Sequence, residues 1–85
     1  MIERLINVVS SSECIGVTVQ SIGCDCGFFV NVNDVDYSGD VLRFGDDDQD
    51  VCIKGLSKCK IKQDVDEYTI VGEDKKNSVI LCVVR

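Results

Sequence analysis

The chain has 85 residues with nine basic and fifteen acidic side chains, a formal net charge of −6 at neutral pH, and no histidine. This length suits one small domain spanning residues 1–85, and 45% hydrophobic residues exclude a chain that is disordered throughout. The negative charge disfavours direct binding to nucleic acid or to an anionic membrane, because both present phosphate groups.

The absence of histidine also bears on catalysis. It removes the commonest general base and the usual Cys–His and Ser–His pairs of nucleophilic enzymes. The aspartates are expected in hydrated loops, where a carboxyl does not acquire the raised pKa of a catalytic acid. We therefore predict a protein that is not an enzyme and that needs no cofactor.

Residues 1–9 are predicted to form a short helix. Ile2, Leu5, Ile6 and Val9 recur at helical spacing and share one face, and three serines follow them. A helix this short is unstable alone, so its apolar face should pack against the rest of the chain. The segment lacks the basic leader and cleavage site of an export signal, which predicts a cytoplasmic protein with reduced thiols.

After residue 12 apolar side chains alternate with polar ones, the pattern of half-buried strands. Turn-forming residues recur about every ten positions, which favours an all-β, mainly antiparallel small barrel or sandwich behind the helix. This order, a helix and then about five to seven strands, is similar to that of Sm-like and SH3-like small barrels. The resemblance implies a fold but no functional residues. The predicted strands are residues 13–20, 27–35, 40–44, 50–54, 58–63, 67–72 and 78–85.

Two of these strands have unusual faces. Lys58, Lys60 and Lys62 would share one side of the strand at 58–63, which is typical of a solvent face or a protected edge strand. The segment 78–85 is apolar on both sides, which predicts a central strand covered on both faces.

The segment from residue 34 to residue 50 contains seven aspartates. Asp34, Asp36 and Ser38 alternate like the first ligands of a calcium loop, and Asp40 would add its backbone carbonyl after Gly39. The bidentate glutamate that should close such a loop is replaced by Gly45. Aspartate, serine and glycine also favour plain hairpin turns, and we prefer that interpretation to a calcium site.

The six cysteines raise the question of zinc. Cys24 and Cys26 form one close pair, to which Cys52 and Cys59 would have to add two further thiolates. This spacing departs from the paired C-x2–4-C pattern of structural zinc sites, so the site is a minor alternative. Cys14 and Cys82 lie in strand patterns, and we expect them in the core, packed as small hydrophobes.

These observations favour a module that binds another protein through acidic loops. Carboxylates on such loops would meet a basic surface, and charge complementarity of this kind speeds association. A narrower hypothesis is an inhibitor that occupies a nucleic-acid-binding channel, because small acidic phage-encoded inhibitors of bacterial defence nucleases are similar in size and charge. The alternatives are a homo-oligomeric small-barrel subunit and a metal-binding domain. The predicted partner-binding residues are Asp34, Asp36, Asp40, Asp46, Asp47, Asp48 and Asp50.

Overall fold

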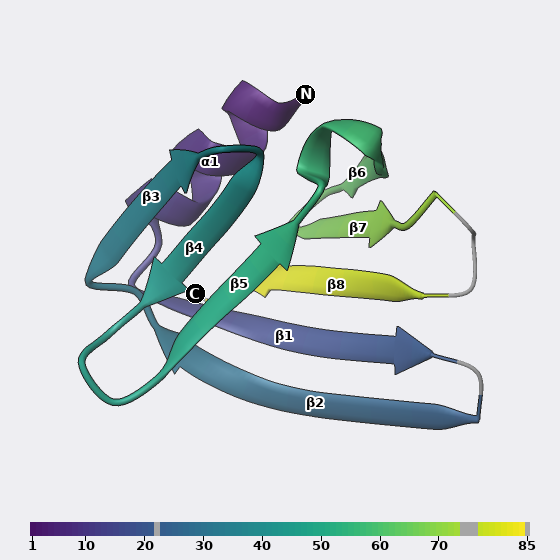
Figure 1. Cartoon of the computed structure of the whole chain (residues 1–85). Helices are drawn as coiled ribbons and strands as arrows, with labels where there is room; N and C mark the ends of the chain where they lie inside the picture. Colours follow the sequence, from purple (N-terminus) through teal and green to yellow (C-terminus); the bar gives the residue numbers. More distant parts are fainter. Residues whose placement is uncertain (22, 74–76, 85) are drawn as a thin grey trace.

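The computed structural model describes residues 1–21, 23–73 and 77–84, with the side chain of Cys24 excepted. This part of the chain forms one α-helix, one 3-10 turn and eight strands arranged in two antiparallel sheets (Figure 1). The predicted all-β fold with an N-terminal helix is confirmed, but the strand count of five to seven was too low. The elements are α1 (Ile2–Ser11), β1 (Cys14–Ser21), β2 (Cys24–Asn31), β3 (Asp34–Ser38), β4 (Val41–Gly45), β5 (Asp50–Lys54), η1 (Leu56–Lys58), β6 (Lys60–Asp64), β7 (Glu67–Val71) and β8 (Ser78–Val83).

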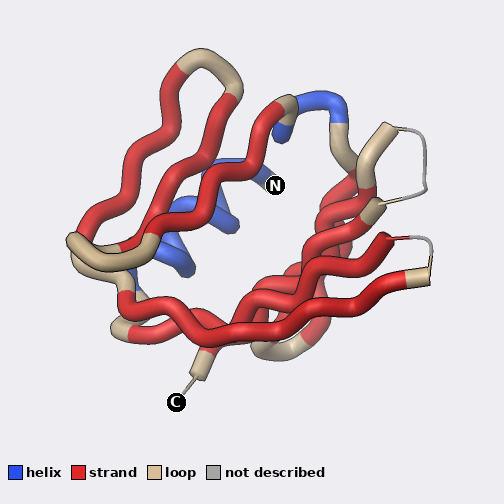
Figure 2. Tube along the Cα trace, turned by 60° about the horizontal axis from the view of Figure 1, so that its bottom comes forward, coloured by secondary structure: helices blue, strands red, loops and turns tan. Residues whose placement is uncertain are grey.

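The larger sheet has the strand order β2-β1-β8-β7-β6, and the smaller sheet has the order β3-β4-β5. Figure 2 shows the two sheets as the walls of an open barrel, with α1 on one side of the space between them. No helix in the described ranges is long and apolar enough to cross a membrane.

A single cluster of buried side chains joins the helix and both sheets. The helix buries Leu5 and Val9, as its spacing predicts, and packs Ile2 and Ile6 against the same cluster. Strand residues enter the cluster at alternate positions because successive side chains of a strand point to opposite faces. Its buried members are Leu5, Val9, Ile15, Val17, Val30, Leu42, Phe44, Ile53, Leu56, Tyr68, Ile70 and Leu81.

The strand predicted over residues 27–35 is divided between the two sheets. Strand β2 ends at Asn31 and β3 begins at Asp34, with a bend between them. At this bend the Val32 N–H donates to Glu13 O at 2.9 Å and the Asn33 N–H donates to Gly45 O at 2.8 Å. The chain thus changes partners from β1 to β4. The alternation changes phase at the bend, because Asn33 and Asp34 are both polar and the inward positions pass from 30 and 32 to 35 and 37. The prediction of one continuous strand over residues 27–35 overlooked this break.

Two further strand predictions need correction. Lys58 lies in η1 rather than on a strand, whereas Lys60 and Lys62 are exposed on β6, an edge strand as predicted. Strand β8 is central in its sheet as predicted, but it is not covered on both faces: Leu81 is buried, whereas Cys82 is exposed. The expectation that Cys82 belongs to the core was therefore wrong.

Candidate functional site

The acidic residues gather on the outer face of the smaller sheet and on the loop that joins β4 to β5. On β3, Asp34, Asp36 and Ser38 are exposed while Val35 and Tyr37 pack inward against the core. The predicted calcium segment is thus mostly a strand. Its polar residues alternate with apolar ones because successive side chains of a strand point to opposite faces, and the apolar residues face the core.

The loop between β4 and β5 is organised by Asp46. One carboxylate oxygen of Asp46 accepts hydrogen bonds from the N–H groups of Asp48 and Gln49, each at 2.9 Å. The Asp46 N–H donates in turn to Gln49 O at 2.8 Å. Such bonds are the local reason why aspartate favours turns. They hold the loop in one shape and leave the side chains of Asp47 and Asp48 exposed.

Gly45 is required at the start of this loop. Its φ is +152°, and a Cβ atom placed there would collide with the backbone of Gln49 and Asp50. Gly45 stands where a calcium loop would need a glutamate, and its function here is structural. Because it lacks a Cβ atom, it lets β4 and β5 approach closely.

Arg43 is a base among these acids. It lies opposite Asp36 in the β3–β4 register, and its Nε is 3.9 Å from a carboxylate oxygen of Asp50. The two partners of this ion pair are about 60% exposed (59% and 61%), so the pair contributes little to stability. The pKa of the Arg43 guanidinium is raised by its contact with Cys52 and then by the charge of Asp50. Arg43 therefore stays charged and offsets one of the surrounding carboxylates.

Asp40 has a different environment from the other aspartates. It adopts a left-handed backbone conformation with φ 61°, and its carboxylate accepts hydrogen bonds from the Tyr37 hydroxyl at 2.9 Å and from Ser57. The Ser57 hydroxyl and N–H donate at 2.7 and 2.8 Å, across 17 positions of sequence. The hydroxyl bond is the largest cause of a lowered pKa for Asp40, and the bond to Asp40 raises the pKa of Tyr37. Asp40 thus joins the β3–β4 turn to η1, a structural role that the sequence did not indicate.

The described zinc candidates lie on different elements. Cys26 is exposed on β2 and Cys52 is exposed on β5, while Cys59 is half-buried after η1, where its thiol lies 3.3 Å from Gly55 O. Burial and the nearby charge of Asp40 raise the pKa of the Cys59 thiol, which disfavours the thiolate that zinc needs. The side chain of Cys24 lies outside the described residues. Within the described residues, no three His, Cys, Asp or Glu side chains are grouped so that they could hold a metal ion.

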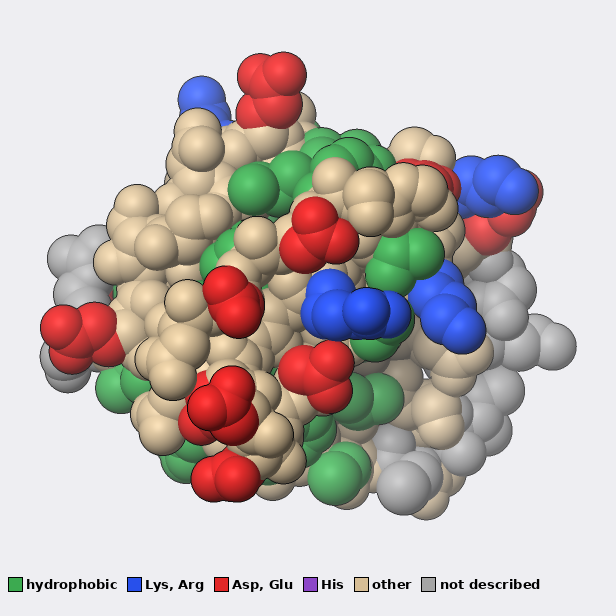
Figure 3. Space-filling view, turned by 60° about the vertical axis from the view of Figure 1, so that its left-hand side comes forward, with side chains coloured by type: hydrophobic (Ala, Val, Ile, Leu, Met, Phe, Trp, Pro, Cys, Tyr) green, Lys and Arg blue, Asp and Glu red, His purple; other side chains and the backbone are tan. Residues whose placement is uncertain are grey.

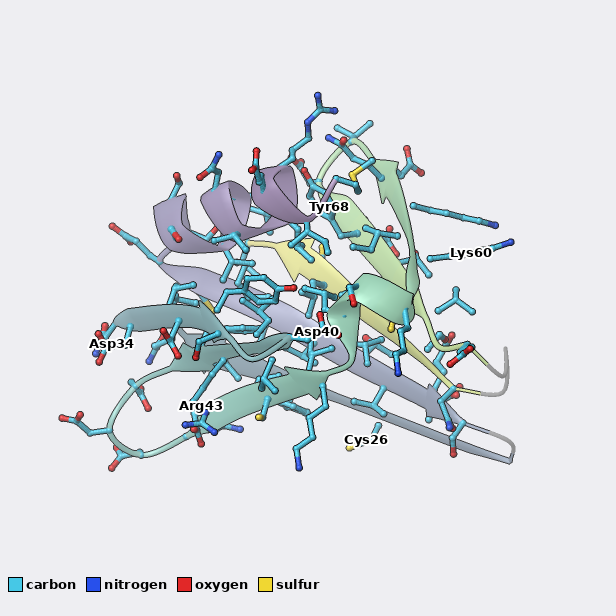
Figure 4. The ribbon with its side chains drawn as sticks, turned by 45° about the horizontal axis from the view of Figure 1, so that its top comes forward. Cys26, Asp34, Asp40, Arg43, Lys60 and Tyr68 are labelled. Carbon is cyan, nitrogen blue, oxygen red and sulfur yellow. The ribbon has the colours of Figure 1, made fainter. Side chains whose placement is uncertain are left out.

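Acidic side chains outnumber basic ones on the outer face of the smaller sheet and its β4–β5 loop. Figure 3 shows the face on which carboxylates gather, with Lys and Arg side chains among them. In Figure 4, Asp34 and Lys60 lie on opposite sides of the molecule. Lys60 therefore does not neutralise the acidic aspartates, whereas Arg43 and Lys54 on the outer side of β4 and β5 offset part of their charge. We call the carboxylates of Asp34, Asp36, Asp46, Asp47, Asp48 and Asp50 the acidic face.

Comparison with protein-family models, with curated proteins and with solved structures finds no match to this chain. The similarity to Sm-like and SH3-like barrels therefore remains one of element order.

Proposed function

We propose that this protein is a non-enzymatic interaction module whose acidic face binds a basic surface of a partner protein. The observation that carries the proposal is the separation of charge. Six aspartates lie on the outer face of the smaller sheet and on its β4–β5 loop together with two bases, Arg43 and Lys54, and Lys60 lies on the far side of the molecule. A field of one sign on one face steers a partner of opposite sign and suppresses binding of acidic proteins.

The way in which the acidic face is held supports this proposal. Asp34 and Asp36 stand on a paired strand, and the loop bearing Asp47 and Asp48 is closed by the hydrogen bonds of Asp46. A surface that is already ordered loses less conformational entropy when it binds. A partner with lysines or arginines at matching spacing, such as the nucleic-acid channel of a DNA-binding protein, suits this arrangement.

The test compares two variants of equal net charge. Asp34, Asp47 and Asp48 make no internal side-chain contact among the described residues, so their joint replacement by asparagine should leave the fold intact. The control carries the substitutions Asp25→Asn, Glu67→Gln and Glu73→Gln. Asp25 lies on β2, Glu67 lies on β7, and Glu73 follows β7 in the chain. Partners are captured at low salt, and the affinity of each is then measured as the salt concentration rises.

The acidic-face variant should bind its partner about five- to 150-fold more weakly, because three charge pairs together contribute about 1–3 kcal/mol. The control should bind as tightly as the unchanged protein. Equal loss in both variants would show that only net charge matters, and undiminished binding in the acidic-face variant would refute the proposal.

Self-association is a second candidate, and one observation favours it. Phe29 is 70% exposed on the outer face of the larger sheet, and its neighbours across the strands include Gly16 and Cys82. This face of the central strands has apolar surface that no part of the described chain covers. The solution mass measured across protein concentrations decides the question, since a strict monomer at all concentrations removes this candidate.

A further inference from the structure

A groove of about 1160 Å³ runs between α1 and the end of the larger sheet where β6 turns into β7 and β8 ends. It is separate from the acidic face. Arg4 on the helix spans it, because its Nη1 donates to Gln63 Oε1 on β6 at 3.1 Å. Pockets for compact small molecules usually measure about 300–1,000 Å³, so an open groove of this size suits an extended ligand better.

Tyr68 lies at this groove and has an unsatisfied polar atom. Its side chain is 2% exposed, and its hydroxyl has no hydrogen-bond partner among the described residues. Figure 4 shows Tyr68 beside α1, and Gln63 lies directly opposite it in the β6–β7 register. Buried hydroxyls nearly always have a partner, because an unpaired one costs free energy. The hydroxyl therefore points to a hydrogen-bonding group that the described chain does not supply.

The rim of the groove is apolar. Met1, Val65 and Val84 are 57%, 88% and 41% exposed, and all three line the groove. They are three of the five large apolar side chains that are exposed in the described part of the chain. Val65 occupies the two-residue turn between β6 and β7, where its backbone φ is negative and no apolar side chain is required. A fully exposed valine at this turn gains nothing from the fold, and it is placed to contact a ligand.

The charges of the groove select the kind of ligand. Glu3, Glu13 and Asp66 line it together with two residues that bear positive groups, Arg4 with its guanidinium and Met1 with its α-amino group, among the residues described. Arg4 already bonds to Gln63. The balance is negative, so a ligand with a positive charge next to an apolar group complements the groove.

We propose that this groove binds an extended peptide segment of another protein, one that carries a lysine or arginine beside an apolar residue. The apolar residue contacts Val65 and Val84, the basic residue lies near Glu13, and a backbone amide pairs with the Tyr68 hydroxyl. The Tyr68 hydroxyl oxygen is itself buried, so the exposed bond between Arg4 and Gln63 has to open before the peptide can reach it.

The probe is a random peptide library displayed on phage and selected on the whole protein, after which the best binder is synthesised and titrated. Enrichment of peptides that combine a basic and an apolar residue is expected, with NMR shift changes confined to the groove. Failure to enrich any peptide, enrichment of acidic peptides, or shift changes located elsewhere would overturn the proposal.

Three substitutions test the contacts. Tyr68→Phe should weaken peptide binding about fivefold, the effect of one hydrogen bond, while the melting temperature stays level or rises because no internal partner is lost.

Val65→Asn should also weaken peptide binding. Asparagine is favourable in turns, so the melting temperature of this variant should not fall. Glu13→Gln should weaken binding more than Asp47→Asn, which removes one charge from the acidic face.

The Tyr68→Phe variant decides between a ligand site and a structural tyrosine. Lower thermal stability with unchanged peptide binding would show that the hydroxyl serves the fold, and the proposal would then be wrong. Because Asp47 lies outside the groove, the result is independent of whether the acidic face binds a partner.

Discussion

The two sheets share one core but present different outer faces. Phe44 and Leu42 of the smaller sheet are buried in the same cluster as Val17 and Leu81 of the larger one. Outside, the smaller sheet carries aspartates around Arg43, whereas the central strands of the larger sheet carry mainly uncharged residues, for example at the row Gly16–Phe29. Packing constrains the inner faces of both sheets alike. The outer faces are free of this constraint, so their difference is where evidence of function is to be sought.

The largest effect should come from the shared core. Phe44→Ala removes a ring that is 1% exposed and should lower the free energy of unfolding by about 3–5 kcal/mol. Urea denaturation followed by circular dichroism measures the loss. Because the core joins both sheets, hydrogen-exchange protection should fall in β8 as well as in β4. Unchanged protection of β8 would show that the larger sheet is stable alone.

The next effect concerns the loop that displays the acidic face. Gly45→Ala should cost about 3 kcal/mol, since the new methyl group would collide with the backbone of Gln49 and Asp50. Gly39→Ala is the control. Gly39 has φ +59° but open space around it, so only a conformational cost of about 1 kcal/mol is expected. Equal costs at both positions would contradict the proposed close contact.

A smaller effect should follow from Asp40 and should depend on pH. The folded-state pKa of Asp40 lies below its ordinary value of 3.8, so its contribution to stability is present above about pH 4 and is lost as pH falls toward the folded-state pKa. Asp40→Asn should therefore lower the melting temperature at neutral pH, and its melting temperature should fall less between neutral pH and about pH 2 than that of the unchanged protein. Ser57→Ala should reproduce part of this change. Parallel pH profiles for the variant and the unchanged protein would contradict the assignment.

The smallest effect is expected on the outer face of the larger sheet. The Phe29 ring lies over Gly16, where a Cβ atom would be 3.3 Å from it, and an aromatic side chain in this position shields a strand glycine. Phe29→Ala should cost about 1 kcal/mol or less, because most of the ring is exposed. A greater loss that grows with protein concentration would indicate that Phe29 lies in an interface between copies of the chain.

Several features of this fold follow from patterns that are local in sequence. Helical spacing identifies Leu5 and Val9 as buried, and alternation identifies Val17 and Val30. Other features escape such patterns. The exchange of partners at Val32 and Asn33 depends on hydrogen bonds to Glu13 and Gly45, which are distant in sequence, and the exposure of Cys82 depends on whether anything covers its sheet.

The candidate sites divide in the same way. The density of aspartates is visible in the sequence, but the sequence does not reveal that Asp46 closes its own loop or that Asp40 reaches Ser57. The groove at Tyr68 was not predicted at all. Its only local signal is Val65, an apolar residue in a hairpin turn.

The sequence by itself therefore determined the helix, most of the strands and many of the inward-pointing side chains, because these depend on neighbours two to four positions away. Tertiary structure alone decided which strands pair, which carboxylates remain in solvent and which hydroxyl stays unpaired. These outcomes depend on residues far apart in the chain, such as Asp40 and Ser57 or Arg4 and Gln63, whose proximity exists only after folding.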